Sequence, residues 1–281
     1  MSDVSVNLEN DNPQILPRMI RARGGLRASF TASEGRTSLA NLYEQGGYRL
    51  KFPKGTNAEA VIINTGGGMA GGDQLDVDLS LGTNAHVTVT TQSAEKIYRA
   101  DAQSSDIAVR LKLELGAHLA WLPQETLLFS GSRLHRTFEA DLAAGASLEL
   151  VESVIFGRGA MGEQLTSGNF QDRWRIRRDG KLIYADNIAL QDDISAALDR
   201  VAIGKGARAI ATFLCIAPDA EARLDAARSA LSLSTCECGA SAWNGLLVAR
   251  FAASDPAVLR RSVIAFLENF RGVSMPRVWQ C

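Results

Sequence analysis

Glycine-rich segments that end in a carboxylate are the first places in this chain where chemistry could occur. Residues 64–73 read NTGGGMAGGD and close on Asp73, and residues 157–163 read GRGAMGE and close on Glu163. If the two segments converge in the fold, their acids would line one polar cavity. Oxygen ligands without thiolates hold a borderline divalent metal only weakly, so such a cavity suits the passage of an ion better than its storage.

Glu95 in SAEK and Glu125 in LPQET extend this set of candidate acids. The simpler interpretation, which we favour for any single acid, is that each carboxylate caps a turn or pairs with an arginine or lysine nearby. A third hypothesis also remains open, namely that the chain is an enzyme that performs an unknown hydrolytic reaction in a carboxylate-lined cavity.

The glycines themselves spell GxGxxG at Gly66, Gly68 and Gly71, but a dinucleotide site is not expected. That motif needs a helix after the glycines and an acid about 20 residues later. Residues 75–81 instead alternate between apolar and polar side chains, which predicts a strand. We therefore expect a glycine-rich turn, or a backbone surface that lines a channel or a partner contact. The candidate structural glycines are Gly66, Gly67, Gly68, Gly71, Gly72, Gly157 and Gly162.

Residue types suited to nucleophilic or zinc chemistry are scarce. There is no GxSxG motif, and the three histidines do not show HExxH spacing. Cys236 and Cys238 form a CxC pair, which is only half of a structural zinc site. Cys215 lies in an apolar run and is expected to be buried and inert.

Composition excludes several classes of function. The formal net charge of −1 and the 6% aromatic content argue against nucleic-acid binding. No apolar run approaches the roughly 18 residues of a membrane span. Residues 1–17 are polar, have no signal-peptide pattern and are expected to be disordered. We expect a cytoplasmic protein with one domain over 18–281.

The elements expected around the acids are mainly strands. A strand, a glycine turn and a second strand recur about every 30 residues, which is typical of stacked hairpins or layers around one core. Asp179-Gly180 predicts a hairpin, and 240–253 is expected to be a single strand. Two helices are predicted in the last third, over about 219–233 and 256–271. Asp255 as the N-cap, Pro256 and Gly272 fix the ends of the second helix. The fold class is therefore mainly β, a layered or helical stack of short strands with two C-terminal helices.

Six segments of the chain form a specific, ordered set of motifs. They are NTGGGMAGGD (64–73), TTQSAEKIYR (90–99), WLPQETLLFSGSRLHR (121–136), GRGAMGE (157–163), DRWRIRRDGKLIYAD (172–186) and PRVWQ (276–280). Together they resemble one known family, that of the urease accessory protein UreD, also called UreH, and the resemblance runs from about residue 24 to the end. Gly67 stands where the family pattern leads us to expect alanine.

The resemblance implies a non-enzymatic chaperone with a largely β fold. It implies a scaffold that acts with UreF and the GTPase UreG on apo-urease, with UreE as the usual nickel donor. The complex would assist GTP-dependent insertion of nickel into the dinickel centre, with nickel passing through an internal tunnel and no stably bound cofactor. Asp73 and Glu163, followed by Glu95 and Glu125, are the positions expected to line that passage. The isolated chain is expected to be poorly soluble, because a docking surface would be left uncovered.

Overall fold

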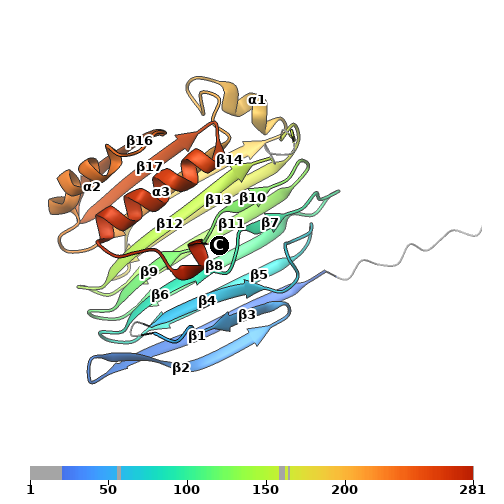
Figure 1. The fold of residues 1–281 in the computed structure, drawn as a ribbon. Helices are drawn as coiled ribbons and strands as arrows, with labels where there is room; N and C mark the ends of the chain where they lie inside the picture. Colours follow the sequence, from blue (N-terminus) through green and yellow to red (C-terminus); the bar gives the residue numbers. More distant parts are fainter. Residues whose placement is uncertain (1–20, 56–57, 158–161, 164, 281) are drawn as a thin grey trace, which may run out of the picture.

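The computed structural model describes residues 21–55, 58–157, 162–163 and 165–280, which form two β-sheets packed face to face (Figure 1). The predicted disordered tail, 1–17, lies outside the described residues. The seven-stranded sheet has the order β14 (Lys181–Gln191), β13 (Asn169–Arg178), β11 (Arg133–Leu142), β8 (Ser105–Leu113), β5 (Gln74–Leu81), β1 (Arg23–Ser33) and β2 (Arg36–Gln45).

The ten-stranded sheet covers the other side of the core. Its order is β16 (Glu237–Trp243), β17 (Leu246–Ala253), β15 (Ala209–Ile216), β12 (Ser147–Phe156), β9 (His118–Leu122), β6 (His86–Thr91), β4 (Glu59–Asn64) and β3 (Tyr48–Lys51), and two short strands, β7 (Glu95–Ile97) and β10 (Thr126–Leu128), extend it beside β12.

Successive strands alternate between the two sheets, so the chain winds as a flattened coil. It crosses from β5 to β6, from β8 to β9 and from β11 to β12, while β5, β8 and β11 pair in parallel and so do β6, β9 and β12. The glycine turns predicted from the sequence connect the strands at these crossings. The repeat of strand, glycine turn and strand therefore produces layers. Gly116 adopts a positive φ of 67°, and a Cβ atom there would lie 2.1 Å from Oδ1 of Asn84 in the preceding coil, so glycine is favoured at this turn.

Two apolar clusters hold the layers together. The first lies between the sheets and takes inward side chains from alternate positions of each strand, such as Val77, Val109 and Leu119. The second lies between the outer face of the ten-stranded sheet and the helices. There Phe213 packs edge-to-face against Phe266 with the ring centroids 5.3 Å apart.

The helices lie in the C-terminal part, as predicted, but one is shorter than expected. The long helix α3 (Pro256–Arg271) begins where the Asp255 side chain accepts a hydrogen bond from Ala257 N at 2.8 Å, and it ends at Gly272. The region 219–233 contains a 3₁₀ turn, η2 (Glu221–Arg223), followed by α2 (Leu224–Leu231). A six-residue helix, α1 (Ile194–Asp199), was not predicted, and a 3₁₀ turn, η3 (Arg277–Gln280), follows α3.

Antiparallel hairpins close the ends of the parallel stack. β1 pairs with β2 and β13 pairs with β14, the latter through the predicted Asp179-Gly180 turn. The expectation of one strand over 240–253 is wrong. β16 and β17 form a hairpin there, because Asn244 and Gly245 both adopt positive φ, as a tight hairpin turn requires.

Candidate functional site

Asp73 holds the glycine-rich loop that it ends. Its Oδ2 accepts a hydrogen bond from Ala70 N at 2.7 Å, and its Oδ1 accepts one from Ala22 N at 2.8 Å. The carboxylate therefore caps its own turn and also ties it to the segment that enters β1. This is the simpler of the two roles that the sequence allowed.

The glycines of this loop permit another segment to pack directly on its backbone. A Cβ at Gly68 would lie 2.7 Å from Lys96 O, and one at Gly71 would lie 2.6 Å from Gln103 O. Met69 bridges Ile97 here in parallel register. The segments 64–73 and 90–99 are thus one structural unit. The remaining candidate glycines with positive φ are Gly67, Gly72, Gly157 and Gly162.

Glu95 on β7 belongs to a group of hydrogen-bonded polar side chains at the edge of the core between the two sheets. Asn64 Nδ2 donates to Glu95 Oε1 at 2.8 Å, and Tyr48 Oη lies 3.5 Å from Glu95 Oε2. Burial raises the pKa of Glu95 to about 7, although the Asn64 and Tyr48 hydrogen bonds oppose the shift. Burial and the charges of Glu95 and Asp73 together raise the pKa of Tyr48. A carboxyl that changes protonation near neutral pH therefore lies beside the glycine-rich loop.

Glu125 faces the opposite way, toward the helices. Arg260 Nη1 on α3 donates to both of its oxygens, at 2.7 and 2.8 Å, and the same guanidinium donates to Trp279 O at 2.9 Å. Trp279 is itself buried, and its indole N–H reaches Thr90 Oγ1 and Leu122 O, both at 3.1 Å. Glu125 therefore attaches α3 and the C-terminal segment to the ten-stranded sheet.

Glu163 accepts a hydrogen bond from Ser130 N at 3.2 Å. The four candidate acids thus have separate partners. Asp73 and Glu95 share the neighbourhood of Tyr48, while Glu125 lies on the helix side. Over the ranges that the structure describes, no group of three or more His, Cys, Asp or Glu side chains is placed to hold a metal ion.

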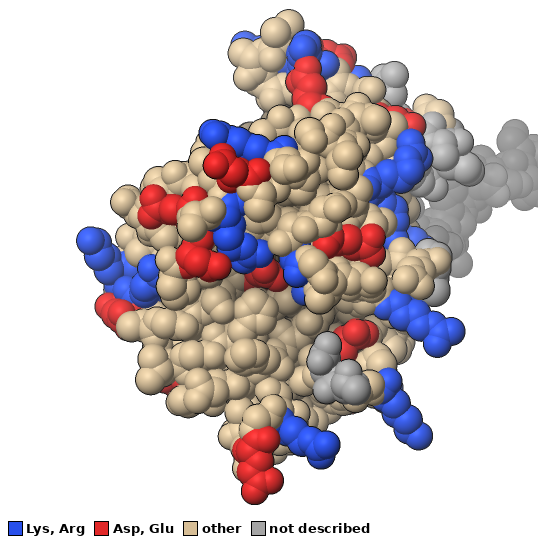
Figure 2. Space-filling model, turned by 60° about the vertical axis from the view of Figure 1, so that its left-hand side comes forward, with Lys and Arg blue, Asp and Glu red and all other residues tan. Residues whose placement is uncertain are grey.

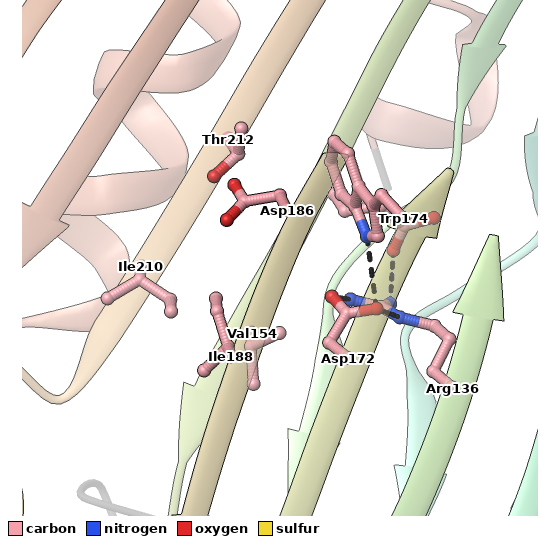
Figure 3. Close-up of a pocket in the computed structure, with 9 residues that line it drawn as sticks. Arg136, Val154, Asp172, Trp174, Asp186, Ile188, Ile210 and Thr212 are labelled. Carbon is pink, nitrogen blue, oxygen red and sulfur yellow. Dashed lines mark hydrogen bonds and ion pairs between the residues drawn. The ribbon is translucent and has the colours of Figure 1, made fainter. Parts of the chain in front are cut away.

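The interior contains a carboxylate cluster that the sequence reasoning did not assemble (Figure 3). Arg136 and Asp172, from neighbouring strands of the seven-stranded sheet, form a two-point ion pair with distances of 3.0 and 2.5 Å. Arg136 Nη1 also donates to Glu152 on the facing sheet. Trp121 Nε1 donates to Glu152 at 2.8 Å and Trp174 Nε1 donates to Asp172 at 3.0 Å. All five side chains are buried.

The formal charge of this cluster is unbalanced, because two carboxylates share one guanidinium. Burial raises the pKa of Glu152, with Asp172 adding to the shift and Arg136 opposing it. A cavity of about 10 Å³, the size of one water molecule, adjoins the cluster and is also lined by Asp186 and Thr212 (Figure 3). The sequence does contain a signal for this cluster, because Asp172 has the same strand parity as the apolar residues Trp174 and Ile176, which alternate with arginines.

One surface group has the residue types of a Ser-His-Asp triad. Ser104 Oγ lies 3.4 Å from His135 Nε2, and His135 Nδ1 lies 3.5 Å from Asp106 Oδ1. His135 and Asp106 are simply cross-strand neighbours on the outer face of the seven-stranded sheet. Both distances exceed the 2.6–3.2 Å of a working acid–base pair, and the His and Asp side chains are about half exposed. The group has the geometry of a solvated sheet face.

A wide groove crosses the end of the sandwich where the chain turns between sheets. Its floor carries His86 and His118, whose rings lie 5.8 Å apart, and Arg271 pairs with Glu149 along it at 2.8 Å. His118 Nδ1 lies 2.8 Å from Ser147 Oγ, so a hydrogen bond to the neighbouring strand fixes this ring.

Apolar side chains from three separate segments line the groove. Leu39 on β2 is 38% exposed, Phe52 after β3 is 41% exposed and Val273 after α3 is 51% exposed. On the face shown in Figure 2, acidic and basic side chains are interspersed, with broad uncharged areas between them. Exposed apolar side chains that gather around a groove are typical of a protein contact surface.

No helix in the described part of the chain is long and apolar enough to cross a membrane. The fold defines a two-sheet β-coil protein whose candidate acids lie in separate places.

The chain belongs to the UreD urease accessory protein family, whose sequence model matches residues 22–280. It is 48% identical over 260 residues to the urease accessory protein UreD of Xanthobacter autotrophicus, covering 92% of this chain and 90% of the relative. It is 44% identical to that of Azorhizobium caulinodans, covering 94% and 98%, and 50% identical to UreD 1 of Methylobacterium radiotolerans, covering 91% and 90%. The family assists urease and is not itself the catalyst.

Proposed function

We propose that this protein is a scaffold for urease maturation. Together with UreF and the GTPase UreG it would bind apo-urease and assist GTP-dependent insertion of nickel, with UreE as an indirect partner that supplies the metal. The observation that carries the proposal is the similarity to urease accessory proteins, at 44–50% identity over more than nine-tenths of the chain. Uncharged areas on the molecular surface and the apolar rim of the groove support a role in protein contacts.

The route of nickel is a second part of the proposal. We propose that the ion passes the glycine-rich loop, where Asp73 and Glu95 lie around Tyr48, and then Glu163 beyond it. Glu125 remains a candidate with a weaker case, because Arg260 neutralises it. Oxygen donors in separate places bind a borderline cation only transiently, as an ion in transit requires.

The scaffold is tested by co-purification with UreF and UreG, followed by activation of apo-urease with nickel, bicarbonate and GTP. We expect a stable complex and activation that depends on this chain. Failure to associate with either protein, or turnover of a small molecule by the chain alone, would refute the proposal.

The route is tested separately with Asp73→Ala and Glu163→Ala at limiting and at excess nickel. Variants that impair passage should activate urease poorly at limiting nickel and recover at excess nickel, while still forming the complex. Normal activation by both variants at limiting nickel would exclude the route but leave the scaffold intact.

A further inference from the structure

Strand β2 forms a free edge of the seven-stranded sheet (Figure 1). It pairs with β1 on one side, and no described residue pairs with its backbone on the other side. Eight of its ten residues are exposed and none is buried. The alternate N–H and C=O groups of its outer side therefore form a row of donors and acceptors that an extended chain can complete.

The features that normally protect a free edge are largely missing from β2. Edge strands commonly carry lysine or proline, or are very short, whereas β2 has ten residues and contains neither lysine nor proline. A single bulge, opposite Ser29 and Phe30, interrupts its pairing with β1. By contrast, the edge of the facing sheet is capped, because Glu44 Oε1 accepts a hydrogen bond at 2.6 Å from Leu50 N on the four-residue strand β3. The free hydrogen-bonding edge at this end of the sandwich is therefore that of β2.

Both faces of β2 carry apolar side chains that a neighbouring strand would cover. Leu39 and Leu42 lie opposite Phe30 and Ala28, which are buried between the sheets, so the two leucines are on the inner face. They are 38% and 39% exposed because the facing sheet ends at the short strand β3. Tyr43, on the outer face, is 53% exposed. An added strand would bury apolar surface on each face while it completes the ladder.

This end of the molecule is basic, although the whole chain is nearly neutral. Residues 21–55, which contain β1, β2 and β3, carry seven arginines and lysines against two glutamates, a formal charge of +5, whereas the whole chain carries −1. Four of these cations are exposed and form no ion pair within the part of the chain that the structure describes: Arg23, Arg36, Lys51 and Lys54. Two copies of the chain joined through β2 would bring like charges together. The charge therefore disfavours a second copy and favours an acidic partner.

We propose that β2 binds an extended, acidic segment of a partner protein, which joins the seven-stranded sheet as an additional strand. Backbone hydrogen bonds supply the affinity. Specificity comes from side chains that alternate along the segment, with acids beside Arg27 on the outer face, where its side chain is 72% exposed, and apolar groups beside Leu42 on the inner face. The inference rests on the proposed scaffold function and specifies one surface of the scaffold and the chemistry of the segment that binds there.

Hydrogen–deuterium exchange of the full chain tests this inference, first alone and then mixed with UreF or with apo-urease. The outward amides of β2 should exchange rapidly in the lone chain and at least about tenfold more slowly in one of the complexes. A complex that forms with unchanged exchange over 36–45 would overturn the inference and leave the scaffold intact. Absence of any complex would refute the scaffold and the inference with it. Slow exchange of these amides in the lone chain would also overturn the inference, because the edge would then be covered without a partner.

Charge reversal tests the acidic character of the bound segment. Arg23→Glu combined with Arg36→Glu changes both ends of β2, and should weaken the complex by roughly tenfold at low salt and reduce its dependence on salt concentration. The matched control combines Arg173→Glu with Arg177→Glu, because these arginines lie on the outer face of β13 in the same sheet and form no ion pair among the described residues. Equal weakening by the two double variants, or a wild-type complex that is insensitive to salt, would contradict an acidic segment on β2.

Discussion

Arg136 on β11 and Asp172 on β13 are directly opposite one another on parallel strands and form a two-point ion pair inside the sandwich. The same guanidinium reaches Glu152 on the facing sheet. One side chain thereby links both sheets of the coil through charged hydrogen bonds in a water-poor interior, where an unpaired charge is far more costly than on the surface.

Removing this arginine should be strongly destabilising. Arg136→Met leaves two carboxylates buried without a cation, so we expect a loss of about 3–5 kcal/mol in the free energy of unfolding, measured by urea denaturation. Arg110→Met is the matched control, because Arg110 pairs with Asp76 and Asp78 on the exposed face and should lose less than about 1 kcal/mol. Equal losses in the two variants would contradict a cross-sheet role for Arg136.

Stability should also depend on pH through Glu95. Its folded pKa of about 7 lies above the ordinary value of 4.5, so the folded state holds a proton that the unfolded chain releases. This contribution is complete below about pH 4.5, declines as pH rises and is lost above about pH 7. Glu95→Gln should therefore flatten the fall in stability between pH 5 and 8, measured by urea denaturation at each pH. Glu114→Gln, at an exposed ion pair, should keep the wild-type slope.

The C-terminal segment should contribute strongly to stability through Trp279. Its side chain is 3% exposed, and its indole N–H donates a hydrogen bond to Thr90 Oγ1 in the sheet. Trp279→Ala should therefore lower the free energy of unfolding by about 3–5 kcal/mol, measured by thermal or urea unfolding. Trp243 on the edge strand β16 is 40% exposed, and Trp243→Ala should change stability by only about 0.5 kcal/mol. If the C-terminal turn were loosely attached, the two substitutions would have similar effects.

If the groove contacts a partner, an acid placed on its rim should interfere with assembly. Leu39→Asp should reduce urease activation by roughly tenfold or more, since one interface anchor is worth about 2 kcal/mol. Leu182→Asp is the control, because Leu182 is also exposed, at 48%, but lies on β14 at the opposite edge of the same sheet. Co-purification and activation assays measure both variants. A loss of activation confined to Leu182→Asp would exclude the groove as the surface that contacts a partner.

The sequence predicted those elements whose signals are local. Asp255, Pro256 and Gly272 define both ends of α3 because capping and proline geometry act within one turn. The glycine turns likewise predicted the layering, because a turn is also determined by a few neighbouring residues. By contrast, the pattern of 240–253 predicts one continuous strand, whereas the Asn244-Gly245 turn divides it into the β16–β17 hairpin.

The partners of the acids were not predictable, because they come from distant parts of the chain. Glu125 and Arg260 are 135 positions apart, and Glu152 meets Arg136 only because two sheets face each other. A single sequence shows that an acid is present and which face of a strand it occupies. The cation that neutralises it is decided by the order in which strands stack, which has no local signature.

The in-register stacking of the coils also limits how the length of such a chain can vary. Val77 lies beside Val109 and Leu79 beside Leu111, and the next coil continues the rows. A single residue gained or lost inside one strand would turn every following side chain of that strand to the wrong face. Relatives can therefore differ freely in length only in the loops between coils, or by gaining or losing an entire winding at once.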